Sequence, residues 1–212
     1  VARLAGGAEL GLGRVGADVD PVTDITLDNV NYHNSFVDTG VAVYDGATGA
    51  GVGVCPLDSP MVSLGEPGEY KFQKRYEPKK PYVYLNLYNN HWRTNFGSWI
   101  GDGGRMESRV RIWAFEKWSA EFALFTPAME ARVPLLAARS TARPGKLPPA
   151  QSGIVLSRKG VAVTAFGPNP DGTGTILRLW EQGGVTGELS VALPAVFKTA
   201  TPVNLRGEKI GN

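Results

Sequence analysis

One short loop holds most of the side chains in this sequence that could bind a polar, ring-shaped ligand. It covers residues 89–99 and gathers amide, imidazole, indole and guanidinium groups directly after an apolar stretch. Sugars present hydroxyl groups beside apolar C–H faces, so their sites favour Asn, Asp and Arg next to a flat aromatic ring. The residues predicted to face a carbohydrate are Asn89, Asn90, His91, Trp92, Arg93 and Asn95.

A structural role is the alternative for the same loop. Trp92, Phe96 and Trp99 would then plug the end of a sheet, and the Asn residues would cap backbone groups. The other three tryptophans lie in or near strand patterns, where a large ring is expected to pack in the core. They are Trp113, Trp118 and Trp180.

Two further patterns carry weaker signals. Residues 11–16 match G-x-G-x-x-G, but a dinucleotide site needs a strand before the glycines and a helix after them. No apolar strand precedes these glycines, and Asp20 and Pro21 after them make a poor helix start. We therefore predict a flexible Gly-rich connection. The only cysteine, Cys55, ends an apolar stretch and is expected to be a buried, inert thiol, although a nucleophilic pair with His91 is conceivable.

Neither the histidines, the cysteine nor the carboxylates form a metal-binding or catalytic pattern. His33 and His91 show no metal-ligand spacing. A single cysteine excludes an internal disulfide and a cysteine-built zinc site. We therefore predict no metal, cofactor or catalytic residue in this chain. Glycosidases use two carboxyl groups roughly 5–10 Å apart, which sequence spacing cannot show. Solvated turn residues are the favoured interpretation of six carboxylates: Asp18, Asp20, Asp24, Asp28, Asp58 and Glu66.

The sequence predicts that strands joined by turns position these residues. A hairpin is predicted from 41–44 and 51–55, and further strands at 70–76, 82–88, 109–115, 153–157, 161–166, 175–181 and 189–193. Residues 121–125 could open a short helix, but Pro127 and Pro134 are expected to interrupt a long one. The predicted fold is all-β, an antiparallel, supersandwich-like β-sandwich with little helix.

A Pro-rich stretch divides the chain. We predict a main β-sandwich domain at 1–142, a linker at 143–152, and a smaller C-terminal β-domain or second lobe at 153–212. The formal charge of +2, from 22 basic and 20 acidic residues, excludes a nucleic-acid partner, and no apolar run is long enough to cross a membrane. The start at Val1, without methionine or signal peptide, suggests a segment of a longer protein.

Several segments occur in an order that resembles the C-terminal region of bacterial proteins related to glycoside hydrolase family 38, the α-mannosidase-like enzymes. These are DPVTDI (20–25), VDTGVAVYD (37–45), CPLDSP (55–60), SLGEPG (63–68) and LYNNHWRTNF (87–96), followed by VAVTAF (161–166) and GTILRLWE (174–181). The likeness covers most of the chain.

The resemblance implies a noncatalytic C-terminal β-domain that supports a catalytic barrel absent from this chain. In that family the nucleophilic Asp and the zinc ion belong to the barrel, so no catalytic residue is carried over. It also implies a carbohydrate partner and contact with an N-terminal catalytic domain, and a bacterial sugar-degrading enzyme of this kind can be exported or periplasmic. In that family a loop of the C-terminal β-region can approach the active site, and we nominate the 89–95 loop, with Asn90 and Arg93 as the substrate-facing candidates. An independent carbohydrate-binding module that depends on Trp92 and a self-contained hydrolase using Asp58 and Glu66 remain alternatives.

Overall fold

The computed structural model describes residues 2–3, 8–14, 17–19, 35–37, 39–67, 78–87, 105–139, 145–146, 148–170 and 172–211. Its elements follow one another in this order: β1 (Ala2–Arg3), β2 (Ala8–Arg14), β3 (Ala17–Val19), β4 (Ser35–Phe36), β5 (Gly40–Asp45), β6 (Gly51–Pro56), β7 (Met61–Leu64), β8 (Val83–Leu85), β9 (Val110–Phe115), the π-helical η1 (Ala120–Phe125), α1 (Thr126–Arg132), β10 (Val155–Leu156), β11 (Val161–Pro168), β12 (Thr175–Glu181) and β13 (Val191–Ala192).

The all-β prediction with little helix is confirmed. Strands account for 33% of the structure and helix for 9%, and the strand pairs of the described residues are antiparallel. The described strands form a six-stranded sheet, a three-stranded sheet with the order β4-β7-β8, and two two-stranded sheets, β10-β13 and β11-β12. The sandwich arrangement and the domain boundaries stay predictions.

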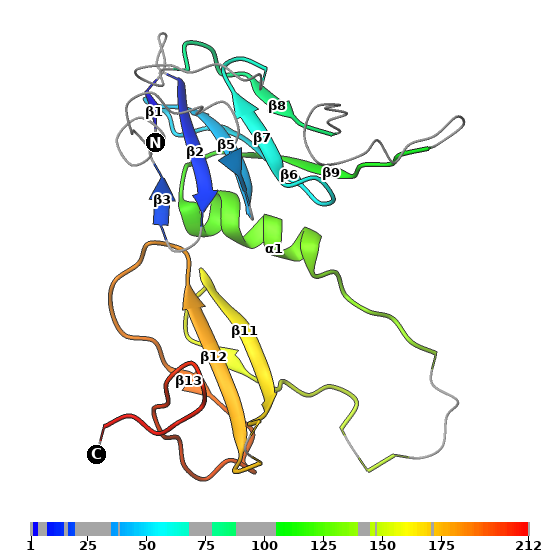
Figure 1. Ribbon diagram of the computed structural model, residues 1–212, viewed down its shortest axis with the longest axis vertical. Coiled ribbons are helices and arrows are strands. Elements are labelled where there is room, and N and C mark those ends of the chain that lie inside the picture. Colours follow the sequence, from blue (N-terminus) through cyan, green and yellow to red (C-terminus); the bar gives the residue numbers. More distant parts are fainter. Residues whose placement is uncertain are drawn as a thin grey trace, which may run out of the picture.

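The six-stranded sheet has the order β1-β2-β5-β6-β9, with β3 paired to β2 (Figure 1). The predicted hairpin is confirmed as β5 and β6, in which Val41 lies opposite Val54 and Tyr44 opposite Gly51. Its turn is held by the Asp45 carboxylate, which accepts the backbone N–H groups of Ala47 and Thr48. Such a side-chain-to-backbone turn is what Asp favours between two strands.

The expectation of a flexible connection near the N-terminus is wrong. Residues 8–14 form strand β2, which runs antiparallel to β5 over six residue pairs. Gly11 and Gly13 interrupt the side-chain pattern, but the backbone ladder with Ala42 and Gly40 fixes the extended conformation. The next described element is strand β3, so the glycines are not followed by the helix that a dinucleotide fingerprint needs.

The helical segment at 120–132 is short, as expected, and it changes type at Pro127: the π-helical η1 ends at Phe125, and Pro127 lies in the first turn of α1. Pro127 has no N–H for the carbonyl of Ala123, four residues earlier, and that loss normally breaks a helix. Here the Trp113 Nε1–H from strand β9 donates to the Ala123 carbonyl at 2.7 Å. Wider π-helical turns precede the proline, and Thr126 donates its hydroxyl to the Glu121 carbonyl at 2.8 Å. The helix ends at Arg132, just before Pro134.

The core of the main sheet lies under this helix. Ala42, Tyr44 and Leu124 are buried there, and Trp113, Phe115 and Trp118 pack against them. The Tyr44 and Trp118 rings stack with centroids 4.6 Å apart. The core roles predicted for Trp113 and Trp118 are therefore confirmed.

The core role predicted for Trp180 is wrong. Its side chain is 37% exposed and lies opposite Ala162 in the two-stranded sheet of β11 and β12, which is too narrow to bury a large ring. These two strands match the predicted strands at 161–166 and 175–181, and the Gly172 N–H donates to the Asn169 carbonyl in the predicted turn between them.

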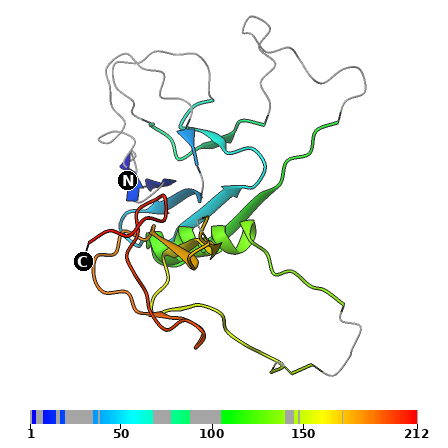
Figure 2. The ribbon, with the colours of Figure 1, turned by 60° about the horizontal axis from the view of Figure 1, so that its bottom comes forward.

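The C-terminal lobe, residues 153–211, lies next to the helical segment 120–132 of the main sheet (Figures 1 and 2). The side chain of Glu121 in η1 lies against the backbone of Gly160 and Gly183. Between α1 and β10 the described residues 134–139, 145–146 and 148–153 are exposed. The predicted linker at 143–152 thus includes exposed residues, as a linker requires.

Candidate functional site

The predicted sugar-facing residues lie outside the described residues. This holds for Asn89, Asn90, His91, Trp92, Arg93 and Asn95, and also for His33 and the predicted strand at 70–76. What the structure does describe is the chain on either side of the loop, at 83–87 and 105–109. Both flanks are bound to the segment 57–63.

The flank before the loop is held by Asn86, directly after β8. Its backbone N–H donates to the Met61 carbonyl at 3.0 Å, and its side-chain Nδ2 donates to the Ser63 Oγ at 3.1 Å. Ser63 is fully buried in strand β7. These bonds continue the β7–β8 pairing by one residue and fix where the chain leaves the sheet.

The flank after the loop is held by an ion pair between Arg109 and Asp58. The Asp58 Oδ2 accepts the Arg109 backbone N–H at 2.7 Å and Nε–H at 3.0 Å, and Oδ1 accepts Nη2–H at 2.7 Å. The Leu57 N–H returns a bond to the Arg109 carbonyl at 2.9 Å. Hydrogen bonds from the Arg109 side chain, followed by its backbone N–H, lower the pKa of Asp58 to about 2.

This geometry bears on the hydrolase alternative. A general acid must hold a proton near neutral pH, and enzymes raise a carboxyl pKa by burial to achieve that. Asp58 is shifted in the opposite direction, and both of its oxygens accept hydrogen bonds from Arg109. Its described role is to fix the start of strand β9.

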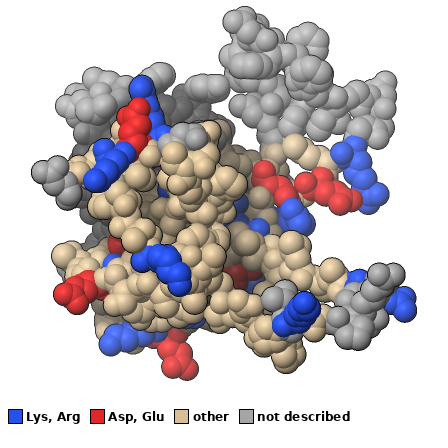
Figure 3. All heavy atoms as spheres, turned by 90° about the horizontal axis from the view of Figure 1, so that it is seen from below, with Lys and Arg blue, Asp and Glu red and all other residues tan. Residues whose placement is uncertain are grey.

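Cys55 is a buried thiol, as predicted, with no exposed surface. Within the described ranges, no group of three or more His, Cys, Asp or Glu side chains is placed to hold a metal ion. In the same ranges, no helix has the length and apolar character needed to span a bilayer. Seen from the side of the C-terminal lobe, basic and acidic side chains are scattered over the described surface without a field of one sign (Figure 3).

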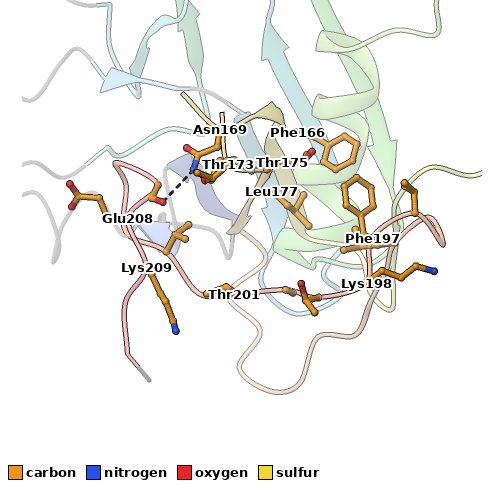
Figure 4. Close-up of a pocket in the computed structure, with 18 residues that line it drawn as sticks. Phe166, Asn169, Thr173, Thr175, Leu177, Phe197, Lys198, Thr201, Glu208 and Lys209 are labelled. Carbon is orange, nitrogen blue, oxygen red and sulfur yellow. Dashed lines mark hydrogen bonds between the residues drawn. The ribbon is translucent and has the colours of Figure 1, made fainter. Parts of the chain in front are cut away.

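A pocket in the C-terminal lobe was missed by the sequence analysis. It has a volume of about 800 Å³ and lies between the end of the β11–β12 hairpin and the segment 193–209 (Figure 4). Its wall contains the aromatic rings of Phe166 and Phe197, four threonines and two lysines. Its lining combines residues of the predicted strands β11 and β12 with residues 196–209, and the sequence signal is limited to the number of Thr and Lys residues in these segments.

No protein-family model, curated protein or solved structure matches the chain.

Proposed function

We propose that this chain is a noncatalytic β-domain of an α-mannosidase-like glycoside hydrolase. It packs against a separate catalytic domain and offers the 89–95 loop to that domain's sugar site. The observation that supports this proposal most is the exposure of Leu135 and Leu136 in the extended segment 133–139. Their exposed fractions are 101% and 95%.

Segment 133–139 has the properties of a docking segment. It leads away from the body of the molecule after α1 in both ribbon views (Figures 1 and 2). Val133, at its start, is also exposed, so three large aliphatic side chains meet water within four residues. Complete burial of one such side chain is worth roughly 1.5–3 kcal/mol, and contiguous apolar surface of this kind marks interaction sites.

The last two strands of the main sheet, β6 and the edge strand β9, offer a second apolar surface. Val52 on β6 and Ile112 on the edge strand β9 are exposed, and Ile112 lies opposite Val54 in the register. These side chains alternate with Trp113 and Phe115, which pack against the buried core cluster under the helix. A strand that packs on both faces is typical of a sheet between two layers, so a neighbouring domain would complete the second face.

The anchoring of the loop flanks fits a supporting role. Loops that bind ligands are usually held by a rigid scaffold. Here Asn86 and Arg109 tie the two flanks to residues 57–63, which comprise the β6–β7 connection and most of strand β7. The carboxylate that the hydrolase alternative would need, Asp58, serves this anchoring.

The docking segment gives a direct experiment. Amide hydrogen exchange of residues 133–139 is compared between this chain and the same chain extended upstream through the proposed catalytic domain. We expect rapid exchange in the short protein and protection in the long one. Leu135→Ser with Leu136→Ser should remove the protection and lower the unfolding temperature of the long protein only.

Leu205→Ser is the matched control, because Leu205 is also highly exposed but lies in the 204–207 turn of the C-terminal lobe. It should leave the protection of 133–139 unchanged. Equal exchange in the short and long proteins would contradict the proposed docking. Binding of a neutral oligosaccharide by the short chain, lost in Trp92→Ala, would instead favour an independent carbohydrate-binding module.

A further inference from the structure

The pocket in the C-terminal lobe is the strongest unassigned feature of the described residues. Its volume of about 800 Å³ lies within the range of roughly 300–1,000 Å³ that is typical of small-molecule sites. The segment 193–209 folds beside strand β12 and closes the pocket on one side (Figure 4).

One wall of the pocket is aromatic. The rings of Phe166 and Phe197 pack edge to face with centroids 5.8 Å apart, and Phe166 remains 46% exposed. Phe166 lies opposite Leu177 in the β11–β12 register, and Leu177 also lines the pocket. An exposed aromatic ring beside an aliphatic side chain offers the flat apolar surface on which the C–H face of a sugar ring packs.

The rest of the wall is polar and held in place. Asn169, only 8% exposed, donates its side-chain amide to the Thr173 hydroxyl at 3.2 Å and to the Gly207 carbonyl at 3.5 Å. This joins the hairpin turn to the C-terminal segment. Hydroxyl groups that can both donate and accept hydrogen bonds line the pocket at Thr173, Thr175, Thr199 and Thr201.

Two cations complete the site. Lys198 and Lys209 line the pocket and are exposed, and Figure 4 shows their side chains on opposite sides of it, with the amines directed outward. The lining carboxylate, Glu208, accepts a hydrogen bond from the Asn204 amide at 2.8 Å and points away from the aromatic pair. The lining therefore carries two positive charges and one negative charge, and favours an anionic ligand.

From this combination we propose that the pocket binds a short acidic oligosaccharide. The phenylalanine pair packs against a sugar ring, the threonine hydroxyls bind its hydroxyl groups, and the two lysines attract carboxylates at its ends. The inference does not rest on the proposed catalytic partner, because all of its residues belong to the C-terminal lobe. An acidic peptide is disfavoured, since it would use the lysines but gain little from the threonines.

The test is a titration of the full chain with trigalacturonate, followed by NMR chemical shifts and calorimetry at low salt. We expect shifts confined to residues around the pocket and an affinity that falls about tenfold in Lys198→Ala with Lys209→Ala, as the loss of two exposed charge contacts would give. Thr175→Val should weaken binding without changing the fold. Lys117→Ala with Lys159→Ala, two exposed lysines outside the pocket, should leave the affinity unchanged.

Three outcomes would overturn the proposal. No shift around the pocket at millimolar trigalacturonate means that the pocket does not bind this class of ligand. Equal affinity for the neutral trisaccharide maltotriose would remove the role of the lysines. Equal affinity for a glutamate-rich peptide of the same charge, or equal loss in the two lysine pairs, would indicate unspecific electrostatic attraction instead.

Discussion

The hydrogen bond from Trp113 to the Ala123 carbonyl allows a quantitative test of how this chain accommodates Pro127 at the junction of η1 and α1. Trp113→Phe keeps an aromatic ring on strand β9 but removes the Nε1–H that donates at 2.7 Å. Ala123 is buried, and Pro127 cannot supply the missing donor. An unpaired buried carbonyl costs about 1–3 kcal/mol, and we expect this loss in addition to the smaller ring area.

Trp118→Phe is the matched control. Trp118 packs against the same core cluster and makes ring contacts with Tyr44 at 4.6 Å and Phe115 at 6.0 Å. Its replacement reduces ring area in a similar way. The free energy of unfolding, measured by urea titration followed by circular dichroism, should therefore fall by about 1–2 kcal/mol more in Trp113→Phe than in Trp118→Phe.

A double-mutant cycle separates the hydrogen bond from packing. Pro127→Ala restores a backbone N–H four residues after Ala123, which can donate to the same carbonyl. The cost of Trp113→Phe should then be smaller by about 1 kcal/mol in the Pro127→Ala background. Equal costs in both backgrounds, together with equal costs for the two tryptophans, would refute the explanation.

Three further results are expected. Gly53→Ala should destabilise the protein by about 1–3 kcal/mol in the same urea titration, because a β-carbon there would overlap the Trp113 indole. Gly167→Ala should be close to neutral, because the space around its β-carbon is open. Asp58→Asn should lower the urea midpoint between pH 8 and pH 5. Because the pKa of Asp58 is lowered to about 2 in the folded state, the difference from the unmodified protein should vanish as the pH falls from about 4 to 2. A difference that persists at pH 2 would contradict the Arg109 ion pair. Residues 153–212 expressed alone should lack a cooperative urea transition, because Val161 is the single buried apolar side chain among the described residues of that lobe; a sharp transition would show an autonomous domain.

The strands with a clear side-chain pattern could be predicted from the sequence. The β5–β6 hairpin, β9, and the β11–β12 pair follow alternation or β-branched runs bounded by turn residues. Strand β2 could not, because its glycines erase the alternation and its conformation depends on pairing with β5, distant in sequence. The junction of η1 and α1 at Pro127 depends on a distant residue for a related reason, since the Ala123 carbonyl accepts a hydrogen bond from a tryptophan on another element.

The pairing of Asp58 with Arg109 shows the same limit at the candidate site. The two residues are 51 positions apart, so their ion pair depends on the contact between the 57–60 segment and the start of β9. The sequence identified Asp58 as a candidate carboxylate but gave no indication that it anchors the flank of the loop. The pocket in the C-terminal lobe escaped prediction because residues 196–209, which supply much of its lining, belong to no strand or helix, and their contact with the β11–β12 hairpin joins residues distant in sequence.

The most direct test of the central proposal is hydrolysis of an aryl α-mannoside in the presence of zinc. This chain alone is compared with the same chain extended upstream through the proposed catalytic domain, at equal molar concentration. We expect turnover only from the longer protein, reduced when Arg93 in the 89–95 loop is replaced by Ala. Turnover by the 212-residue chain alone that persists through repurification would contradict a noncatalytic role.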